Sequence, residues 1–154
     1  MRVLPMTPFV IGVGLALATF GFGRISGFDR DRAFYSTVLI PVATYYILFA
    51  AMAPSESPWL IESIIAGGFV AIAAVGFRSS LWIVAAGLVA HGVLDLTHAR
   101  LVDNPGVPPW WPAFCMAYDV ALGAMMALLL AKGATLSARG NQRHPARTAS
   151  DSGH

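Results

Sequence analysis

Five long apolar stretches limit the folds that this chain can adopt more than any other feature of its sequence. Each is long enough for a helix that rises about 1.5 Å per residue to cross about 30 Å of hydrocarbon. Hydrophobic residues make up 56% of the chain and charged residues 12%, about half the charged fraction of an average soluble domain. We therefore predict an all-α transmembrane domain over residues 1–136, with five helices at about residues 5–22, 33–52, 59–77, 81–98 and 111–131.

Basic residues in the connecting segments predict how these helices are oriented. Five spans place the two termini on opposite sides of the membrane, and cytoplasmic segments carry the excess of Lys and Arg. This predicts an outer N-terminus and a cytoplasmic C-terminus, with polar residues 137–154 as a disordered cytoplasmic tail. The predicted cytoplasmic side holds Arg24, Arg30, Arg32, Arg78, Lys132, Arg139, Arg143 and Arg147, whereas Arg2 and Arg100 lie on the other side.

The fourth apolar stretch carries three ionisable side chains, His91, Asp95 and His98, at spacings that place them on one helix face. Ionisable groups are costly inside a membrane and usually mark a functional site there. The fourth span runs outward and the fifth inward, so Asp119 should lie about as deep as His91. Glu62 begins the third span on the same outer side. These five side chains are therefore predicted to meet in one outward-facing pocket.

Small residues predict which helices form this pocket. Gly87 precedes His91 by one helical turn, and Gly123 follows Asp119 by one turn. Glycine allows close approach of helix backbones in lipid, where packing drives association. We expect the fourth and fifth spans to touch along the face that carries His91, Asp95 and Asp119.

Aromatic and thiol side chains are expected around the same pocket. Tyr46 ends the second span on the outer side and could supply an orienting hydroxyl, and Tyr118 lies beside Asp119 in the fifth span. Trp110 and Trp111 belong to a proline-rich loop at the headgroup level and could cover the pocket. Cys115 is the sequence's one cysteine, so the chain contains no internal disulfide.

A divalent metal site is the most specific chemistry that these residues suggest. Imidazole and carboxylate groups suit zinc, iron or manganese, and an open coordination position could hold water or an oxidant. The predicted metal ligands are His91, Asp95, His98 and Asp119. In a metal-assisted or acid/base enzyme, or a binder of a small or lipid-soluble molecule, His91, Asp95, Asp119 and Glu62 would be the catalytic groups.

Two other classes of function remain open. The polar side chains could join helices, His91 to Asp119 and His98 to Asp95 or Glu62, in a scaffold, a homo-oligomer or a partner subunit of another membrane protein. Such contacts contribute about 0.6–2 kcal/mol each. They could also form a proton-linked transport path, although the inner half of the spans has no ionisable partner. The net charge of +2 and the dispersed basic residues argue against nucleic-acid binding.

Three segments carry a family resemblance. They are Phe28–Tyr35, running on to Tyr45 and Tyr46; His91–His98; and Asn104–Cys115, ending in Tyr118 and Asp119. Together they resemble a family of small bacterial integral membrane proteins of unknown function, over about residues 22–130. The resemblance implies a compact helical protein of the bacterial inner membrane. It implies no activity and no catalytic residue.

Overall fold

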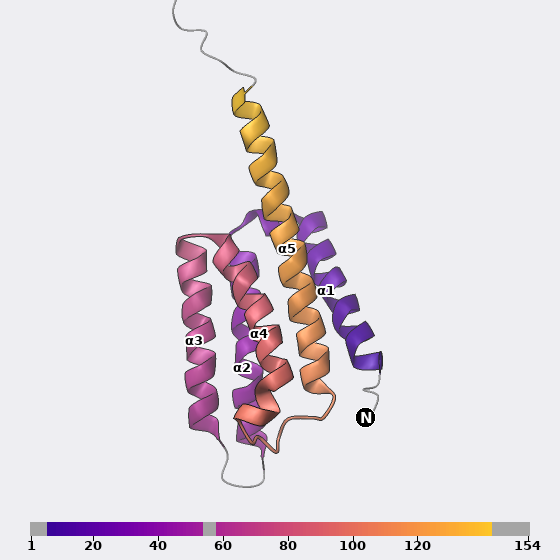
Figure 1. Cartoon of the computed structure of the whole chain (residues 1–154), viewed down its shortest axis with the longest axis vertical. Helices are drawn as coiled ribbons and strands as arrows, with labels where there is room; N and C mark the ends of the chain where they lie inside the picture. The colour runs from indigo at the N-terminus through magenta and orange to yellow at the C-terminus, as the bar shows by residue number, and fades with distance from the viewer. Residues whose placement is uncertain (1–5, 54–57, 143–154) are drawn as a thin grey trace, which may run out of the picture.

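The computed structural model describes residues 6–53 and 58–142, with side chains up to residue 133. It contains five α-helices, as predicted, and the described residues include no β-strand. A short 3-10 helix, η1 (Phe28–Arg30), follows the first of them. The α-helices are α1 (Met6–Ser26), α2 (Ala33–Met52), α3 (Trp59–Arg78), α4 (Leu81–Leu101) and α5 (Trp111–Gln142), which Figure 1 shows as one upright bundle.

The C-terminal end of α5 differs from the prediction. Residues 137–142, which we expected in a disordered tail, continue the helix to Gln142. Ala138, Arg139 and Gln142 are good helix formers, and the helix continues past the apolar part of the sequence despite Gly140. The apolar part of α5 extends over Trp111–Gly133. The remainder of the predicted tail, residues 143–154, and residues 54–57 between α2 and α3 lie outside the described residues.

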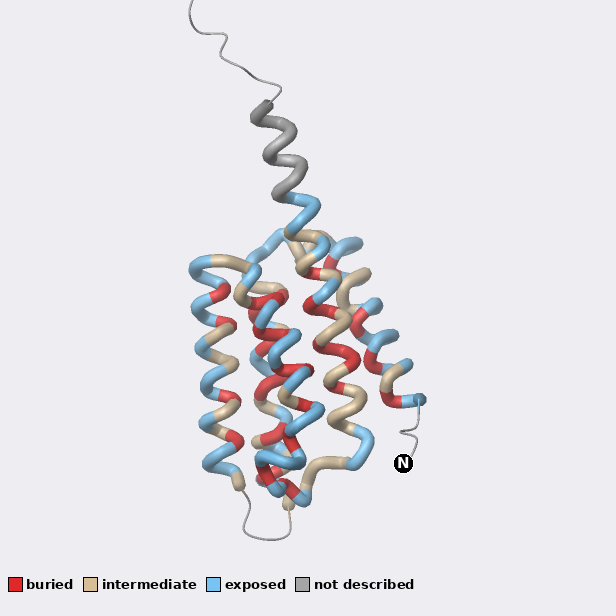
Figure 2. The backbone as a smooth tube through the Cα atoms, in the orientation of Figure 1, coloured by how far each residue is buried: buried red, intermediate tan, exposed pale blue. Residues whose placement is uncertain are grey.

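Each helix is long and apolar enough to cross a membrane. In Figure 2 the buried positions of the helices face the middle of the bundle and the exposed positions lie along its outside. Large apolar residues such as Val10, Ile64 and Leu96 are more than half exposed. A soluble protein rarely leaves so much contiguous apolar surface in water. Length, composition and surface together indicate a multi-pass membrane protein.

Helix packing follows the order α1, α5, α4, α3, α2, with α2 also touching α4. Glycine allows the closest approaches: a Cβ at Gly12 of α1 would collide with the Phe114 carbonyl oxygen of α5, and one at Gly123 of α5 would lie 3.0 Å from the Ala85 carbonyl oxygen of α4. The predicted contact between the fourth and fifth spans is therefore confirmed. Gly87 instead faces Leu39 of α2 and Ile72 of α3.

Candidate functional site

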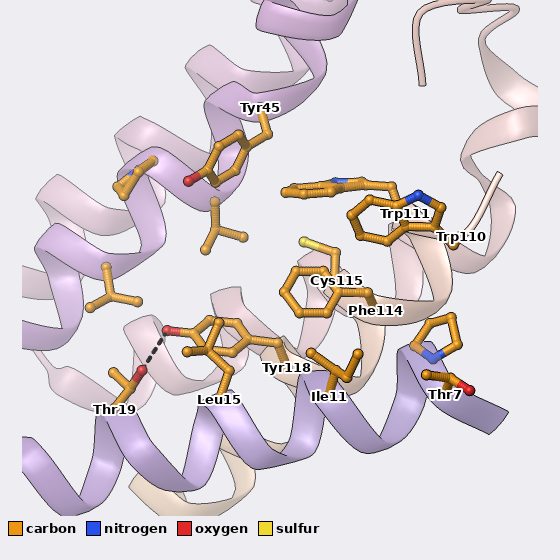
Figure 3. A pocket seen from close by; sticks show the side chains of 14 residues that line it. Thr7, Ile11, Leu15, Thr19, Tyr45, Trp110, Trp111, Phe114, Cys115 and Tyr118 are labelled. Carbon is orange, nitrogen blue, oxygen red and sulfur yellow. Dashed lines mark hydrogen bonds between the residues drawn. The ribbon is translucent and has the colours of Figure 1, made fainter. Parts of the chain in front are cut away.

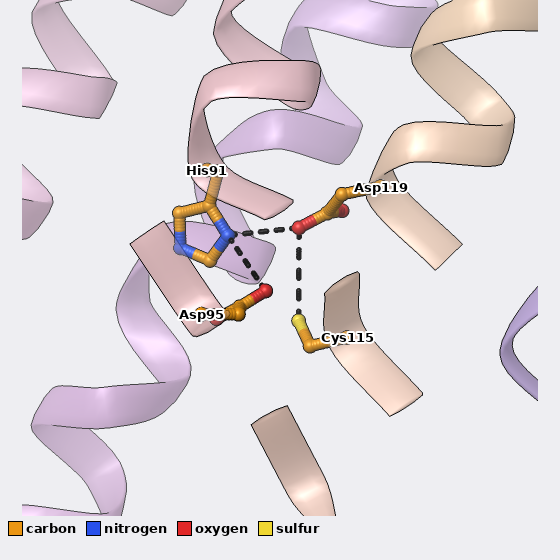
Figure 4. A group of neighbouring side chains, drawn as sticks. All are labelled: His91, Asp95, Cys115 and Asp119. Atoms are coloured by element: carbon orange, nitrogen blue, oxygen red, sulfur yellow. Dashed lines mark hydrogen bonds and ion pairs between the residues drawn. The ribbon is translucent and has the colours of Figure 1, made fainter. Parts of the chain in front are cut away.

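Four buried side chains from α4 and α5 form a polar cluster in the interior of the bundle (Figure 4). These residues, His91, Asp95, Cys115 and Asp119, are called the polar cluster below. His91 Nδ1 lies 2.8 Å from Asp119 Oδ2 and 3.6 Å from Asp95 Oδ2. The Cys115 thiol donates to Asp119 Oδ2 at 3.7 Å. The cluster brings together three of the four predicted metal ligands and adds Cys115.

Helix periodicity and one glycine explain why these groups meet. His91 and Asp95 are one turn apart on α4, and Cys115 and Asp119 are one turn apart on α5, so each pair shares a helix face. Gly92 lies between the two helices, where an added Cβ would be 3.3 Å from Asp119 Cβ and 3.1 Å from the Met116 carbonyl oxygen. The missing side chain at Gly92 therefore allows α5 to bring Asp119 to the His91 ring.

The carboxylates of the cluster are incompletely hydrogen bonded. Tyr46 donates its hydroxyl to Asp95 Oδ1 at 2.7 Å. Among the described residues, Asp95 Oδ2 and Asp119 Oδ1 are buried without a hydrogen-bond partner. Buried polar atoms nearly always have partners in native proteins, and an exception calls for an explanation such as an ion.

The donor atoms are also close enough to share one ion. One ligand atom from each of the four residues lies within 4.8 Å of the others. Together they offer an imidazole nitrogen, a thiol sulfur and two carboxylate oxygens. Zinc binds all three of these ligand types, whereas magnesium and calcium prefer oxygen ligands alone. The residues present therefore fit a zinc-type centre.

His98 lies in a second polar group and not in the polar cluster. Its Nε2 is 3.0 Å from Glu62 Oε1 and 3.1 Å from Glu62 Oε2. Asn104 Nδ2 donates to the same Glu62 Oε1 at 2.8 Å and to the Tyr46 carbonyl oxygen at 3.1 Å. His98 lies two turns from His91, about 10 Å along the helix axis, and α3 offers it a nearer carboxylate. Our prediction of His98 as a fourth ligand beside His91 therefore does not agree with this geometry.

Tyr46 joins the two polar groups. Its hydroxyl binds Asp95 of the polar cluster, while its ring stacks on His98 with ring centroids 3.8 Å apart and an interplanar angle of 16°. The orienting hydroxyl predicted for Tyr46 is thus directed at Asp95. Phe69 of α3 contacts the polar cluster at His91, with the two ring centroids 4.9 Å apart.

An elongated cavity of about 890 Å³ adjoins the polar cluster between α1, α2 and α5 (Figure 3). Four of the predicted pocket residues, Cys115, Tyr118, Trp110 and Trp111, line it. Tyr46 does not, because successive residues point about 100° apart on a helix, and Tyr45 lines the cavity instead. The other lining residues are Thr7, Pro8, Ile11, Leu15, Thr19, Val38, Pro41, Val42 and Phe114.

Sequence reasoning missed Asn104 as a site residue. Asn104 begins a turn in the α4–α5 loop, and its side-chain oxygen accepts the Gly106 N–H at 3.2 Å, a bond typical of Asn in turns. Its amide nitrogen meanwhile reaches Glu62 and the end of α2. The available signal was the position of an amide side chain in the loop that follows the histidine-bearing helix.

Comparisons with protein-family models, with curated proteins and with solved structures found no match to this chain.

Proposed function

We propose that this protein is a membrane-embedded, metal-dependent enzyme whose polar cluster holds one divalent cation, most suitably zinc. The observation that carries the proposal is the arrangement of four buried ligand atoms of three kinds within 4.8 Å of one another. Two of these residues, His91 and Asp95, come from one helix turn, and the other two come from a turn of the facing helix. A site built on packed helices holds its ligands in fixed positions.

The charge of the polar cluster supports a cation. Two aspartates are buried there beside one histidine, and within the described part of the chain their ion pairs are with His91. A single imidazolium could offset one carboxylate but not both. A divalent ion would offset the second negative charge and would occupy carboxylate oxygens that otherwise lack partners.

Each residue then has a defined role. His91, Asp95, Cys115 and Asp119 would be the ligands, and Tyr46 would orient Asp95 through its hydroxyl. Zinc can accept a water or substrate oxygen as a fifth ligand, and it lowers the pKa of bound water and polarises carbonyl oxygens, which suits it to hydrolytic chemistry. The Glu62–His98 pair, on the far side of the Tyr46 ring, would keep that ring in place and supply a second proton-exchanging carboxylate.

We also propose the bacterial inner membrane as the location, with the polar cluster in the outer half of the bilayer. Arg24 near the end of α1, Arg30 and Arg32 after it, and Arg78 at the end of α3 lie at one end of the bundle, opposite the α4–α5 loop. The positive-inside rule assigns that end to the cytoplasm. The polar cluster and the cavity then lie closer to the other side.

A purely structural role is the second candidate, and a specific observation favours it. Both helix-joining pairs that this alternative predicts, His91 with Asp119 and His98 with Glu62, are present. The two candidate functions differ in whether the carboxylate oxygens without hydrogen-bond partners bind an ion. In a structural role they would remain without partners, at a cost to stability.

Elemental analysis of detergent-purified protein tests the proposal. Wild type should carry close to one zinc per chain, whereas His91→Ala and Cys115→Ser should lose most of it. His98→Ala is the matched control, because it removes an equally buried imidazole of the same helix from outside the polar cluster. His98→Ala should therefore keep the metal.

Cobalt substitution gives an independent readout. Cobalt-loaded wild type should show the charge-transfer absorption of a thiolate ligand, and Cys115→Ser should lack it while remaining monodisperse. Wild type that binds no zinc, iron, manganese or cobalt after reloading would overturn the metal proposal and leave the structural role. Equal metal loss in His98→Ala and His91→Ala, with both variants folded, would overturn the assignment of ligands.

A further inference from the structure

The cavity beside the polar cluster is lined by residues that, apart from Cys115, have no role in the metal proposal. It extends from a rim at Ile11 and Leu15 of α1, whose side chains are 56% and 48% exposed, to a floor at Val42 and Cys115, which are buried. The rim faces the surroundings of the bundle. In a bilayer those surroundings are lipid chains, so the cavity opens sideways into the membrane.

Helix packing explains this opening. α1 packs along α5 but makes few contacts with α2, and it meets α2 near η1, where Gly23 lies against the Phe34 ring. Towards the other end, α1 and α2 separate around the cavity, with Tyr45 on one wall and Leu15 on the other (Figure 3). The cavity is thus closed at the η1 end and open along its length between α1 and α2.

The lining selects an uncharged occupant. None of its described side chains is charged, and the Tyr118 hydroxyl donates to Thr19 Oγ1 at 3.3 Å. A phosphate or carboxylate headgroup would find no cation on these walls. The volume of about 890 Å³ falls within the usual range for small-molecule sites, about 300–1,000 Å³, and most such sites are likewise apolar.

Two polar features point to where the occupant's polar end would lie. Cys115 belongs both to the cavity lining and to the polar cluster, where its Sγ lies 3.7 Å from Asp119 Oδ2. Trp111 also lines the cavity, and its Nε1 is buried without a hydrogen-bond partner among the described residues. An occupant's hydroxyl or carbonyl oxygen that reached this indole N–H would satisfy it.

We propose that this cavity binds a neutral single-chain lipid that enters from the bilayer between α1 and α2, with a hydroxyl or carbonyl end directed at Cys115. This names the substrate class of the metal-dependent enzyme proposed above and rests on that proposal for any reaction at the polar cluster. The binding itself does not depend on a metal. A helix of a second copy, about 10 Å wide, would cover the rim but would not reach Cys115.

Photolabelling tests the proposal with a defined probe. The full chain is reconstituted in phosphatidylcholine vesicles with a long-chain fatty alcohol that carries a diazirine in its chain, and the labelled peptides are mapped by mass spectrometry. Labels should concentrate on lining residues of α1, α2 and α5, and excess unlabelled alcohol should remove them. An equal excess of fatty acid, with its carboxylate, should compete much less well.

Cavity-filling variants give the matched comparison. Leu15→Trp fills the rim, whereas Leu17→Trp makes the same change on the same helix at a residue that is 56% exposed and outside the lining. Leu15→Trp should lower competable labelling by at least about tenfold, and Leu17→Trp should leave it unchanged. If Leu15→Trp fails to fold, Ile11→Trp serves as a second filling variant.

Zinc content is measured in the same samples, so that the two proposals can fail separately. Competable labelling without metal would sustain the lipid site and overturn the metal centre. Metal retained in wild type, with labels spread evenly over lipid-facing residues or unaffected by Leu15→Trp, would overturn the lipid site alone. A stable dimer that excludes the probe and dissociates in Leu15→Trp would assign the cavity rim to a second copy and overturn it as well.

Discussion

Two tyrosines of α2 offer a direct test of how the buried polar groups contribute to stability. The side chains of Tyr46 and Tyr35 are both buried, with exposed fractions of 3% and 2%. The Tyr46 hydroxyl donates to Asp95 Oδ1 at 2.7 Å, whereas the Tyr35 hydroxyl has no hydrogen-bond partner among the described residues. The same substitution, tyrosine to phenylalanine, should therefore destabilise the protein at Tyr46 but not at Tyr35.

The expected change in the free energy of unfolding depends on whether each hydroxyl makes a hydrogen bond. Tyr46→Phe would leave both oxygens of Asp95 without a hydrogen-bond partner and should lower the free energy of unfolding by about 1–2 kcal/mol, the upper part of the range for polar contacts in membranes. Tyr35→Phe removes a buried hydroxyl that has no partner, and it should be neutral or raise the free energy of unfolding by up to about 1 kcal/mol. The two variants should differ by about 2 kcal/mol.

Reversible unfolding in mixed micelles, followed by tryptophan fluorescence, measures this difference. Two kcal/mol corresponds to about a 30-fold difference in the unfolding equilibrium constant, which such titrations resolve. The two variants keep the same packing volume, so the comparison isolates the hydroxyl groups. Equal destabilisation by both substitutions would refute the reasoning, because it would show that the hydrogen bond to Asp95 contributes nothing beyond packing.

Two further predictions concern close packing and the loop. Gly123→Ala, whose Cβ would lie 3.0 Å from the Ala85 carbonyl oxygen, should destabilise the bundle by about 1–3 kcal/mol. Gly67→Ala has open space around its Cβ and should stabilise the protein by about 0.5–1 kcal/mol. The same unfolding titration compares the two variants. Destabilisation by Gly67→Ala would contradict the packing argument. Asn104→Ala removes the hydrogen bonds to Glu62 and to the end of α2, so it should lower the free energy of unfolding by about 1–3 kcal/mol. It should also speed hydrogen exchange in residues 102–110. Unchanged exchange there would show that the loop is held by other contacts.

The helices could be predicted from the sequence because a membrane leaves the backbone few choices. Apolar stretches of spanning length must form helices to satisfy their own hydrogen bonds. Depth could be predicted as well, since the chain direction and the rise per residue place His91 and Asp119 at similar levels. Their contact at 2.8 Å confirms that part of the prediction.

The partners of each side chain could not be predicted in the same way, because they depend on how each helix is rotated about its axis. His98 shares a face with His91, yet α3 brings Glu62 to it, and Cys115 takes a place in the polar cluster that we had assigned to His98. Adjacent residues were confused for the same reason: Tyr46 turns towards Asp95 while Tyr45 lines the cavity. These rotations are set by packing between helices, which a single sequence does not specify.

The packing of α1 against α5 has a consequence for how the protein is made. Of these five helices, α1 is synthesised first and its main partner, α5, is synthesised last. The bundle therefore cannot finish folding until α5 has been synthesised. A chain that stops before Trp111 would leave His91 and Asp95 in the bilayer without Asp119, and α1 without a neighbour. Incomplete copies would thus carry unpaired polar groups inside the membrane, a feature that distinguishes them from finished protein and exposes them to degradation.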